Sequence, residues 1–201
     1  YFPQHGYDHA RISFYDRSPK SRKLENGSIE AQIRDALSTI RYYQDLYAHV
    51  YITGHSLGAL TVYLALPQLR NIKAVSLWDP SFDVTHFWST GDYLTYISAI
   101  DKYHLDYGNV YVLSPEMVTG LQSYPDAVCL TQAEDITTPM QFIIPEETIF
   151  RASPHTSPEN YRDSIKAPFD LTHIDKANHT FTYNGNAQTL FTHTQRWFDT
   201  I

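Results

Sequence analysis

The stretch that decides the fold is VYITGHSLGALTVYLAL, residues 50–66. It opens with β-branched and aromatic residues, which are typical of a short buried strand. It ends with an apolar segment that reads as a helix closed by Pro67. Between the two, Gly54, Ser56 and Gly58 interrupt the apolar run with the spacing Gly-x-Ser-x-Gly. The stretch therefore predicts a strand, a sharp turn and a helix, in that order.

The residue types in this turn suit a reactive serine. Glycines two positions before and two positions after Ser56 relieve crowding where the backbone bends, and the bend directs a strained serine away from the sheet. The serine then lies at a helix N-terminus, where free N–H groups and the helix dipole favour developing negative charge. We expect the N–H of Leu57 to be such a donor. A tight turn that serves packing alone is the alternative interpretation.

Strand and helix signals alternate along the rest of the chain. Apolar residues recur every three or four positions from Ser28 to Tyr47, which predicts an amphipathic helix with Ser28 as its N-cap. The alternation favours an α/β fold with a mostly parallel sheet and helices on both faces. We expect a single domain over residues 1–201, with a small helical insertion or cap at about 83–125. Further strands are predicted at residues 9–15, 72–78, 139–144 and 169–174, and further helices at residues 157–167 and 186–198.

Composition narrows the range of partners. The net charge of −7 argues against nucleic acid or an anionic membrane as the main partner. No apolar run approaches the roughly 20 residues that span a bilayer, and no signal peptide is evident, so we expect a cytoplasmic protein without a membrane span. The one cysteine, Cys129, excludes an internal disulfide, and we expect a buried, inert thiol there. Oligomeric state is not predicted.

The serine turn resembles the nucleophile elbow of the α/β-hydrolase family. The resemblance implies a catalytic serine, an acid and a histidine in that order along the chain, with the histidine in a loop after the last strand. The stretch ANHTF, residues 177–181, looks like this loop and assigns the catalytic base to His179. His173 lies within the preceding strand and is expected to be structural. His55 lies inside the elbow and is expected to point into the fold.

The resemblance leaves three carboxylates open as the triad acid. Family members usually carry the acid after the strand that precedes the histidine strand, and the segment DITTPMQFIIPEETIF resembles that region. Glu147 is therefore favoured, with Glu146 as its neighbour. The rival is Asp79, because some lipases that resemble the family carry the acid after the strand that follows the elbow. The acid would fix the tautomer of the histidine and stabilise its imidazolium.

The front of the chain looks incomplete beside this family. The stretch HGYDHARISFYDRSPKS, residues 5–21, resembles the place where a family helix ends and the next strand begins. In relatives, an earlier strand and its loop come before this point, and that loop supplies a second oxyanion N–H. The resemblance therefore implies an N-terminally incomplete hydrolase domain.

The leading hypothesis is a serine esterase that acts on an ester, thioester or related acyl bond of a small molecule. Ser56 would attack, His179 would transfer the proton, and Glu147 or Asp79 would orient the histidine. No metal or organic cofactor is implied, because the sequence has no cluster with metal-ligand spacing and no dinucleotide or phosphate loop. An acyltransferase with the same nucleophile and a non-catalytic, hydrolase-like binding domain are the alternatives.

Overall fold

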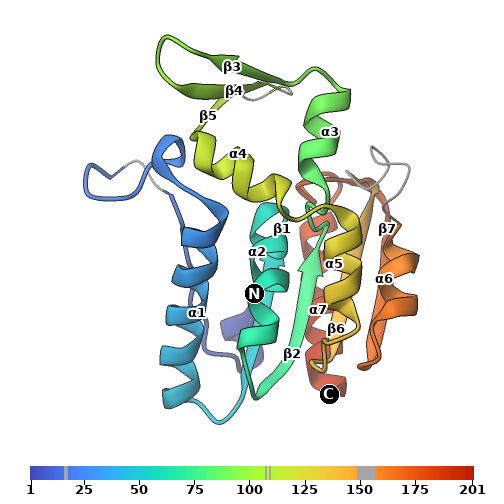
Figure 1. Cartoon of the computed structure of the whole chain (residues 1–201). Coiled ribbons are helices and arrows are strands. Elements are labelled where there is room, and N and C mark those ends of the chain that lie inside the picture. Colours follow the sequence, from blue (N-terminus) through green and yellow to red (C-terminus); the bar gives the residue numbers. More distant parts are fainter. Residues whose placement is uncertain (16–17, 107, 109, 149–156) are drawn as a thin grey trace.

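Four parallel strands form the centre of the molecule (Figure 1). The computed structural model describes residues 1–15, 18–106, 108, 110–148 and 157–201. Within them the sheet has the order β1-β2-β6-β7, so the strands follow one another in chain order. The neighbours β2 and β6 are separated in sequence by a long segment. The strands are β1 (Val50–His55), β2 (Ile72–Trp78), β6 (Met140–Glu147) and β7 (Phe169–Asn178).

The four strands confirm the predictions from residues 50, 72, 139 and 169 onward, within a few residues. The interior strands β2 and β6 are buried along most of their length, as expected for a parallel sheet that is covered on both faces. The last two strands extend further than the apolar runs predicted, as far as Glu147 and Asn178. These polar extensions reach the edge of the sheet where the strands end.

Helices cover the two faces of the sheet. On one face, α1 (Ile29–Leu46) and α2 (Leu57–Ala65) belong to the large apolar cluster that includes Val75 and Leu77 of β2. On the other face, α7 (Asn186–Thr200) contributes Leu190 to a smaller cluster with residues of β6 and β7. Figure 1 shows α7 behind the sheet and α1 on the opposite side. The structure therefore confirms the predicted α/β fold with a parallel sheet between helices.

Local signals placed the ends of α1 and α2 correctly, whereas the helix predicted at residues 157–167 ends earlier, at Ser164. The hydroxyl of Ser28 accepts a hydrogen bond of 3.1 Å from the N–H of Ala31, which caps α1 as predicted. Pro67 follows the end of α2 and lies in a short 3-10 turn, Leu66–Gln68. On α7, Leu190, Thr194 and Phe198 are buried, and the indole of Trp197 donates to the carbonyl of Val75 at 3.0 Å. None of the described helices is long and apolar enough to cross a membrane.

The segment between β2 and β6 is not purely helical, so the expected helical insertion at 83–125 needs correction. A three-stranded antiparallel sheet of order β3-β4-β5 lies between its helices and projects from the domain (Figure 1). The strands are four or five residues long and mostly half-exposed, which explains why no single period emerged from the sequence. Its elements are α3 (Val84–Thr90), β3 (Leu94–Ile97), β4 (Lys102–Asp106), β5 (Val110–Leu113) and α4 (Pro115–Gln122).

Two shorter helices complete the core: α5 (Asp126–Ala133) leads into β6, and α6 (Pro158–Ser164) leads into β7. Cys129 of α5 is fully buried, and burial raises the pKa of its thiol to about 12. An un-ionised thiol without solvent access is a poor nucleophile, in line with the expected inert cysteine.

The prediction of a strand at residues 9–15 is wrong. This segment has no strand in the structure, and most of it is exposed. Its two residues that pack against the main core, Phe14 and Tyr15, are consecutive, so the alternation does not mark one buried face. Nearby, the ring of Tyr7 lies edge-on to that of Tyr51 on β1. A strand also needs a backbone partner, and a short alternating pattern cannot reveal whether one exists.

The two glycines of the serine turn differ in their surroundings. A Cβ at Gly54 would lie 2.7 Å from the Cα of Ala59 and 2.8 Å from the carbonyl oxygen of Gly58, so this position requires glycine. A Cβ at Gly58 would meet nothing within 4 Å. The expectation that both glycines relieve crowding therefore holds for Gly54 and not for Gly58.

This difference predicts opposite effects on stability. Gly54→Ala forces α2 away from β1 and should lower the free energy of unfolding by about 1–3 kcal/mol, the usual cost of overpacking. Gly58→Ala is the matched control, because alanine is favoured over glycine in a helix by up to about 1 kcal/mol. Urea unfolding of the two variants measures both changes. A Gly54→Ala variant as stable as the wild type would contradict the packing argument.

Candidate active site

The register of the sheet places two polar residues side by side at the carboxyl ends of neighbouring strands. His55, the last residue of β1, pairs with Trp78, the last residue of β2. The next residues along the two chains are Ser56 and Asp79. The N–H of Ser56 donates to the carbonyl of Trp78 at 3.0 Å, and the N–H of Asp79 donates to the carbonyl of Ile143 on β6 at 2.9 Å. Backbone bonds therefore fix both residues against the adjacent strand.

Both residues have left-handed φ angles. The backbone of Ser56 has φ 56° and ψ −125°, between the end of β1 and the start of α2 at Leu57. Asp79 has φ 40°. Residues other than glycine rarely have such angles, and they persist only where the surrounding structure imposes them. Here, the sharp bend predicted at the serine is present, and Ser56 directly precedes the first turn of α2, whose N–H groups have no partner within the helix.

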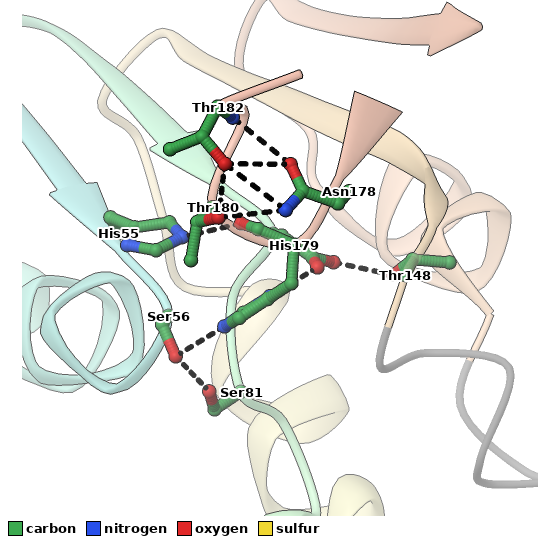
Figure 2. Close-up of polar contacts among 9 residues, drawn as sticks. His55, Ser56, Ser81, Thr148, Asn178, His179, Thr180 and Thr182 are labelled. Carbon is green, nitrogen blue, oxygen red and sulfur yellow. Dashed lines mark hydrogen bonds and ion pairs between the residues drawn. The ribbon is translucent and has the colours of Figure 1, made fainter. Parts of the chain in front are cut away.

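Three side chains form a continuous hydrogen-bonded chain. His179 Nε2 lies 2.9 Å from Ser56 Oγ, and His179 Nδ1 lies 2.6 Å from Asp79 Oδ2. Asp79 is fully buried, and its other oxygen, Oδ1, accepts a hydrogen bond from the hydroxyl of Thr148. The side chain of His179 is 30 % exposed, so the middle of the hydrogen-bonded chain is partly open to solvent. Figure 2 shows the imidazole of His179 directed at Ser56.

The structure does not bring the favoured acid to the histidine. Glu147 is exposed near the end of β6, where it is paired in register with Asn178 of β7. Glu146 is also exposed, and its carboxylate accepts from the N–H of Lys176 at 2.7 Å. The residue of this segment that faces the site is Thr148, which binds the buried carboxylate. Asp79, the rival in the sequence analysis, therefore takes the place that Glu147 was expected to take.

A network of short side chains shapes the loop that carries His179. The side chain of Asn178 donates to the hydroxyl of Thr180 at 2.9 Å and accepts from the N–H of Thr182 at 2.9 Å (Figure 2). Between them, Phe181 is 1 % exposed and packs in the apolar cluster beneath α7. The loop is thus closed on itself by Asn178 and anchored to the core by Phe181, which limits the movement of the imidazole.

His55 joins this loop to the serine turn. Its Nε2 lies 2.7 Å from the carbonyl oxygen of His179. A carbonyl only accepts, so Nε2 carries the proton and donates, which defines the tautomer of His55. Burial lowers the pKa of the His55 imidazole below its usual range. His55 therefore points into the fold, as expected from the sequence, as a neutral donor to the histidine loop.

Sequence reasoning missed two polar neighbours of this chain. Thr148 binds the Asp79 carboxylate, and the hydroxyl of Ser81 lies 3.0 Å from that of Ser56. The sequence gives only a weak indication of the Ser81 contact, which is that this serine lies two residues after Asp79, one of the candidate acids. His173, expected to be structural, is on the exposed face of β7, 4.0 Å from Glu159. Within the described residues, no group of three His, Cys, Asp or Glu side chains is arranged to hold a metal ion.

The arrangement was compared with known proteins. No family model and no curated protein matches the chain. Among solved structures, the esterase domain of a Rhodothermus marinus protein has 17% identity and a TM-score of 0.60, with 82% of this chain and 67% of that chain covered. A structure described for LipS and LipT, two metagenome-derived lipolytic enzymes, has 18% identity and a TM-score of 0.65, with 98% and 84% covered.

A third similar structure is the α/β hydrolase GrgF from Penicillium sp. sh18, with 12% identity, a TM-score of 0.63 and coverage of 88% of this chain and 73% of that chain. The chain has the α/β-hydrolase fold. In this α/β-hydrolase fold, the cluster around Ser56 lies at the carboxyl edge of the parallel strands, the place where ligands bind in open α/β sheets. At sequence identities this low, the similarity to these structures shows the fold alone, so the chemistry is argued from the local geometry of the site.

The buried His55 predicts a specific dependence of stability on pH. In the unfolded chain, the imidazole has its usual pKa of about 6.5, whereas in the folded protein that pKa is lowered. Below about pH 6.5 the unfolded chain therefore binds a proton that the folded protein resists, and stability falls as the pH falls. His55→Gln, which keeps an N–H donor for the His179 carbonyl, should flatten this decline.

Urea midpoints of the wild type and His55→Gln at pH 5.5 and pH 8 measure the effect. At pH 8 the imidazole is neutral in both states, so any difference there reports packing alone. An equal loss of stability on acidification in the two proteins would contradict the proposed link to His55.

Proposed function

We propose that this protein is a serine hydrolase that cleaves an ester, thioester or related acyl bond of a small-molecule substrate. The observation that carries the proposal is the hydrogen-bonded chain from Ser56 Oγ through His179 to the buried carboxylate of Asp79. Such a chain activates a hydroxyl that is otherwise a weak nucleophile. Two of the similar structures are an esterase domain and a structure described for lipolytic enzymes, which supports the same class of reaction.

The proposed reaction begins with proton transfer inside this chain. The Asp79 carboxylate keeps the proton of the neutral imidazole on Nδ1, which leaves the lone pair of Nε2 free to accept from Ser56. As Ser56 Oγ bonds to the acyl carbon, its proton moves to Nε2, and the carbonyl π electrons move to the oxygen. The N–H of Leu57, at the start of α2, is a donor for that oxyanion. The buried carboxylate stabilises the imidazolium that forms.

The second half of the reaction returns the proton and releases the acyl group. The imidazolium of His179 donates its Nε2 proton to the leaving oxygen or sulfur as the bond to the acyl carbon breaks, and Ser56 is left acylated. Water then attacks the acyl carbon while its proton moves to Nε2. The tetrahedral adduct collapses as the C–Oγ bond breaks and Nε2 returns this proton to Ser56 Oγ, which gives a carboxylic acid and free Ser56. The partial exposure of His179 is compatible with the entry of water at this step.

The nucleophile is tested by labelling and turnover. Ser56→Ala should abolish reaction with a fluorophosphonate and lower kcat for p-nitrophenyl esters by about 10⁶-fold, as removal of a catalytic serine does elsewhere. Ser164, half-buried at the end of α6 with its hydroxyl donating to the carbonyl of Asn160 in its own helix, provides a matched control through Ser164→Ala. A folded wild type that neither reacts with the probe nor hydrolyses esters would refute the enzymatic proposal and favour a binding domain.

The acid is tested by two neutral substitutions. Asp79→Asn keeps the shape of the side chain but no longer holds the imidazole in the required tautomer, so kcat should fall by about 10⁴-fold. Glu147→Gln is the matched control, because Glu147 is exposed and the structure pairs His179 with Asp79 instead. Ester turnover of both variants distinguishes the two carboxylates. The assignment fails if Glu147→Gln loses more activity than Asp79→Asn.

A further inference from the structure

The hydroxyl of Ser81 contacts Ser56 Oγ, the attacking oxygen, but the mechanism proposed above gives it no role. It lies two residues after Asp79 and is 3 % exposed. Its Oγ is 3.0 Å from Ser56 Oγ, and its N–H donates to the Ser56 carbonyl at 3.3 Å. Figure 2 shows the Ser81 hydroxyl and the His179 imidazole approaching the Ser56 hydroxyl from different directions. Two separate groups therefore contact one oxygen atom.

Proton counting gives the direction of the Ser81 bond. The carboxylate of Asp79 can only accept, so His179 Nδ1 carries the proton, and the neutral ring has a bare Nε2. Ser56 Oγ has one proton, and it is donated to that Nε2. In the contact with Ser81, Ser56 Oγ can therefore only accept. The hydroxyl of Ser81 is the donor, aimed at the oxygen that attacks.

Burial of the Ser81 hydroxyl is unfavourable in free energy unless a hydrogen bond to its one partner offsets the loss of contact with water. Within the part of the chain that the structure describes, Ser56 Oγ is the one hydrogen-bond partner of the Ser81 hydroxyl. Burial of a hydroxyl without a hydrogen bond is unfavourable by about 1–3 kcal/mol in proteins. An alanine would fill the same space without this requirement. The placement of Ser81 is therefore explained by the reaction better than by packing.

During the reaction, the best hydrogen-bond acceptor near the Ser81 hydroxyl changes from Ser56 Oγ to the carbonyl oxygen of the substrate. When Ser56 Oγ bonds to the acyl carbon, its lone pairs become poorer acceptors. Negative charge then develops on the carbonyl oxygen, which is bonded to the same carbon and so lies within reach of a hydroxyl that touches Oγ. A rotation about the Cα–Cβ and Cβ–Oγ bonds of Ser81 redirects its proton from one oxygen to the other.

We propose that Ser81 is a further catalytic residue, a side-chain oxyanion donor that in the resting site is held on Ser56 Oγ. This inference rests on the proposed serine hydrolase function. In the resting state, the Ser81 hydroxyl fixes the rotamer of the nucleophile. In the tetrahedral adduct it adds a second hydrogen bond to the oxyanion beside that of the Leu57 N–H. No atom is exchanged, and Ser81 keeps its proton throughout.

The test compares Ser81→Ala, Ser81→Thr and Ser81→Cys in the 201-residue chain, with thermal melting to confirm that each is folded. Removal of one oxyanion donor lowers kcat by about 10²–10³-fold, so Ser81→Ala should lose activity in that range while KM stays close to the wild-type value. Affinity for an alkyl boronic acid, which forms an anionic tetrahedral adduct with the serine, should fall in parallel. Ser81→Thr, which keeps the hydroxyl, should recover most of both losses. Ser81→Cys, with a similar shape and a weak donor, should behave like alanine and carries the comparison if Ser81→Ala does not fold.

The outcomes separate this inference from the function on which it rests. Activity that depends on Ser56 but is unchanged or raised in Ser81→Ala overturns the role of Ser81 alone. A loss of kcat without a matching loss of boronate affinity also overturns it, because an oxyanion donor must stabilise the anionic tetrahedral adduct as well as the transition state. A wild type no more active than Ser56→Ala overturns both proposals together.

Discussion

The parallel register of β1 and β2 is the constraint on which the candidate site depends. With His55 opposite Trp78, the chain leaves both strands at the same level, and Ser56 and Asp79 emerge as neighbours. A shift of one residue would turn each of these side chains toward the opposite face of the sheet. The same register lets Ser56 donate its N–H to Trp78, and the register of β2 with β6 lets Asp79 donate its N–H to Ile143. Hydrogen bonds of the sheet thus determine the spacing of the two residues before any side chain contributes.

The buried carboxylate of Asp79 is a second constraint on the structure. Asp79 has no exposed surface, and a buried charge is strongly unfavourable unless it is paired and hydrogen-bonded. His179 satisfies one oxygen and Thr148 the other. Because His179 comes from a loop 100 positions further along the chain, this charge ties the end of β7 to the end of β2. The fully buried Phe181 supports the loop from below, so apolar packing and charge pairing favour the same loop conformation.

The sequence predicted the parts of this structure that depend on local pattern. The strand–turn–helix around Ser56 and the cap at Ser28 follow from residue types at short range, and the structure has both. The acid depended on a choice among three carboxylates whose side-chain directions no local pattern specifies. The end of β6 was identified as part of the site, but its polar contribution comes from Thr148 rather than Glu147, one position away. A shift of one position is invisible to residue counting, although it reverses the direction of a side chain at a strand end.

The segments that the sequence misjudged share a dependence on partners. Residues 9–15 alternate like a strand, yet no described strand pairs with them. The strands β3, β4 and β5 are short and half-exposed, so each is weakly marked on its own, and together they are stabilised by antiparallel pairing. In both cases the outcome depends on whether another segment supplies backbone hydrogen bonds, which composition and periodicity do not record.

The precision of the candidate site comes from backbone groups more than from the reactive side chains. Each member lies next to a bond that involves the main chain: Ser56 N–H to Trp78, Asp79 N–H to Ile143, Ser81 N–H to Ser56, and the His55 ring to the His179 carbonyl. A misplacement of about 1 Å can cost a catalytic group about 10²-fold in rate, so anchoring of this kind matters for any acyl transfer here. It also explains how the chain can carry a projecting antiparallel sheet between β2 and β6. The insertion begins after Ser81, so the four anchoring bonds lie outside it, and the site is held by the parallel sheet and the histidine loop.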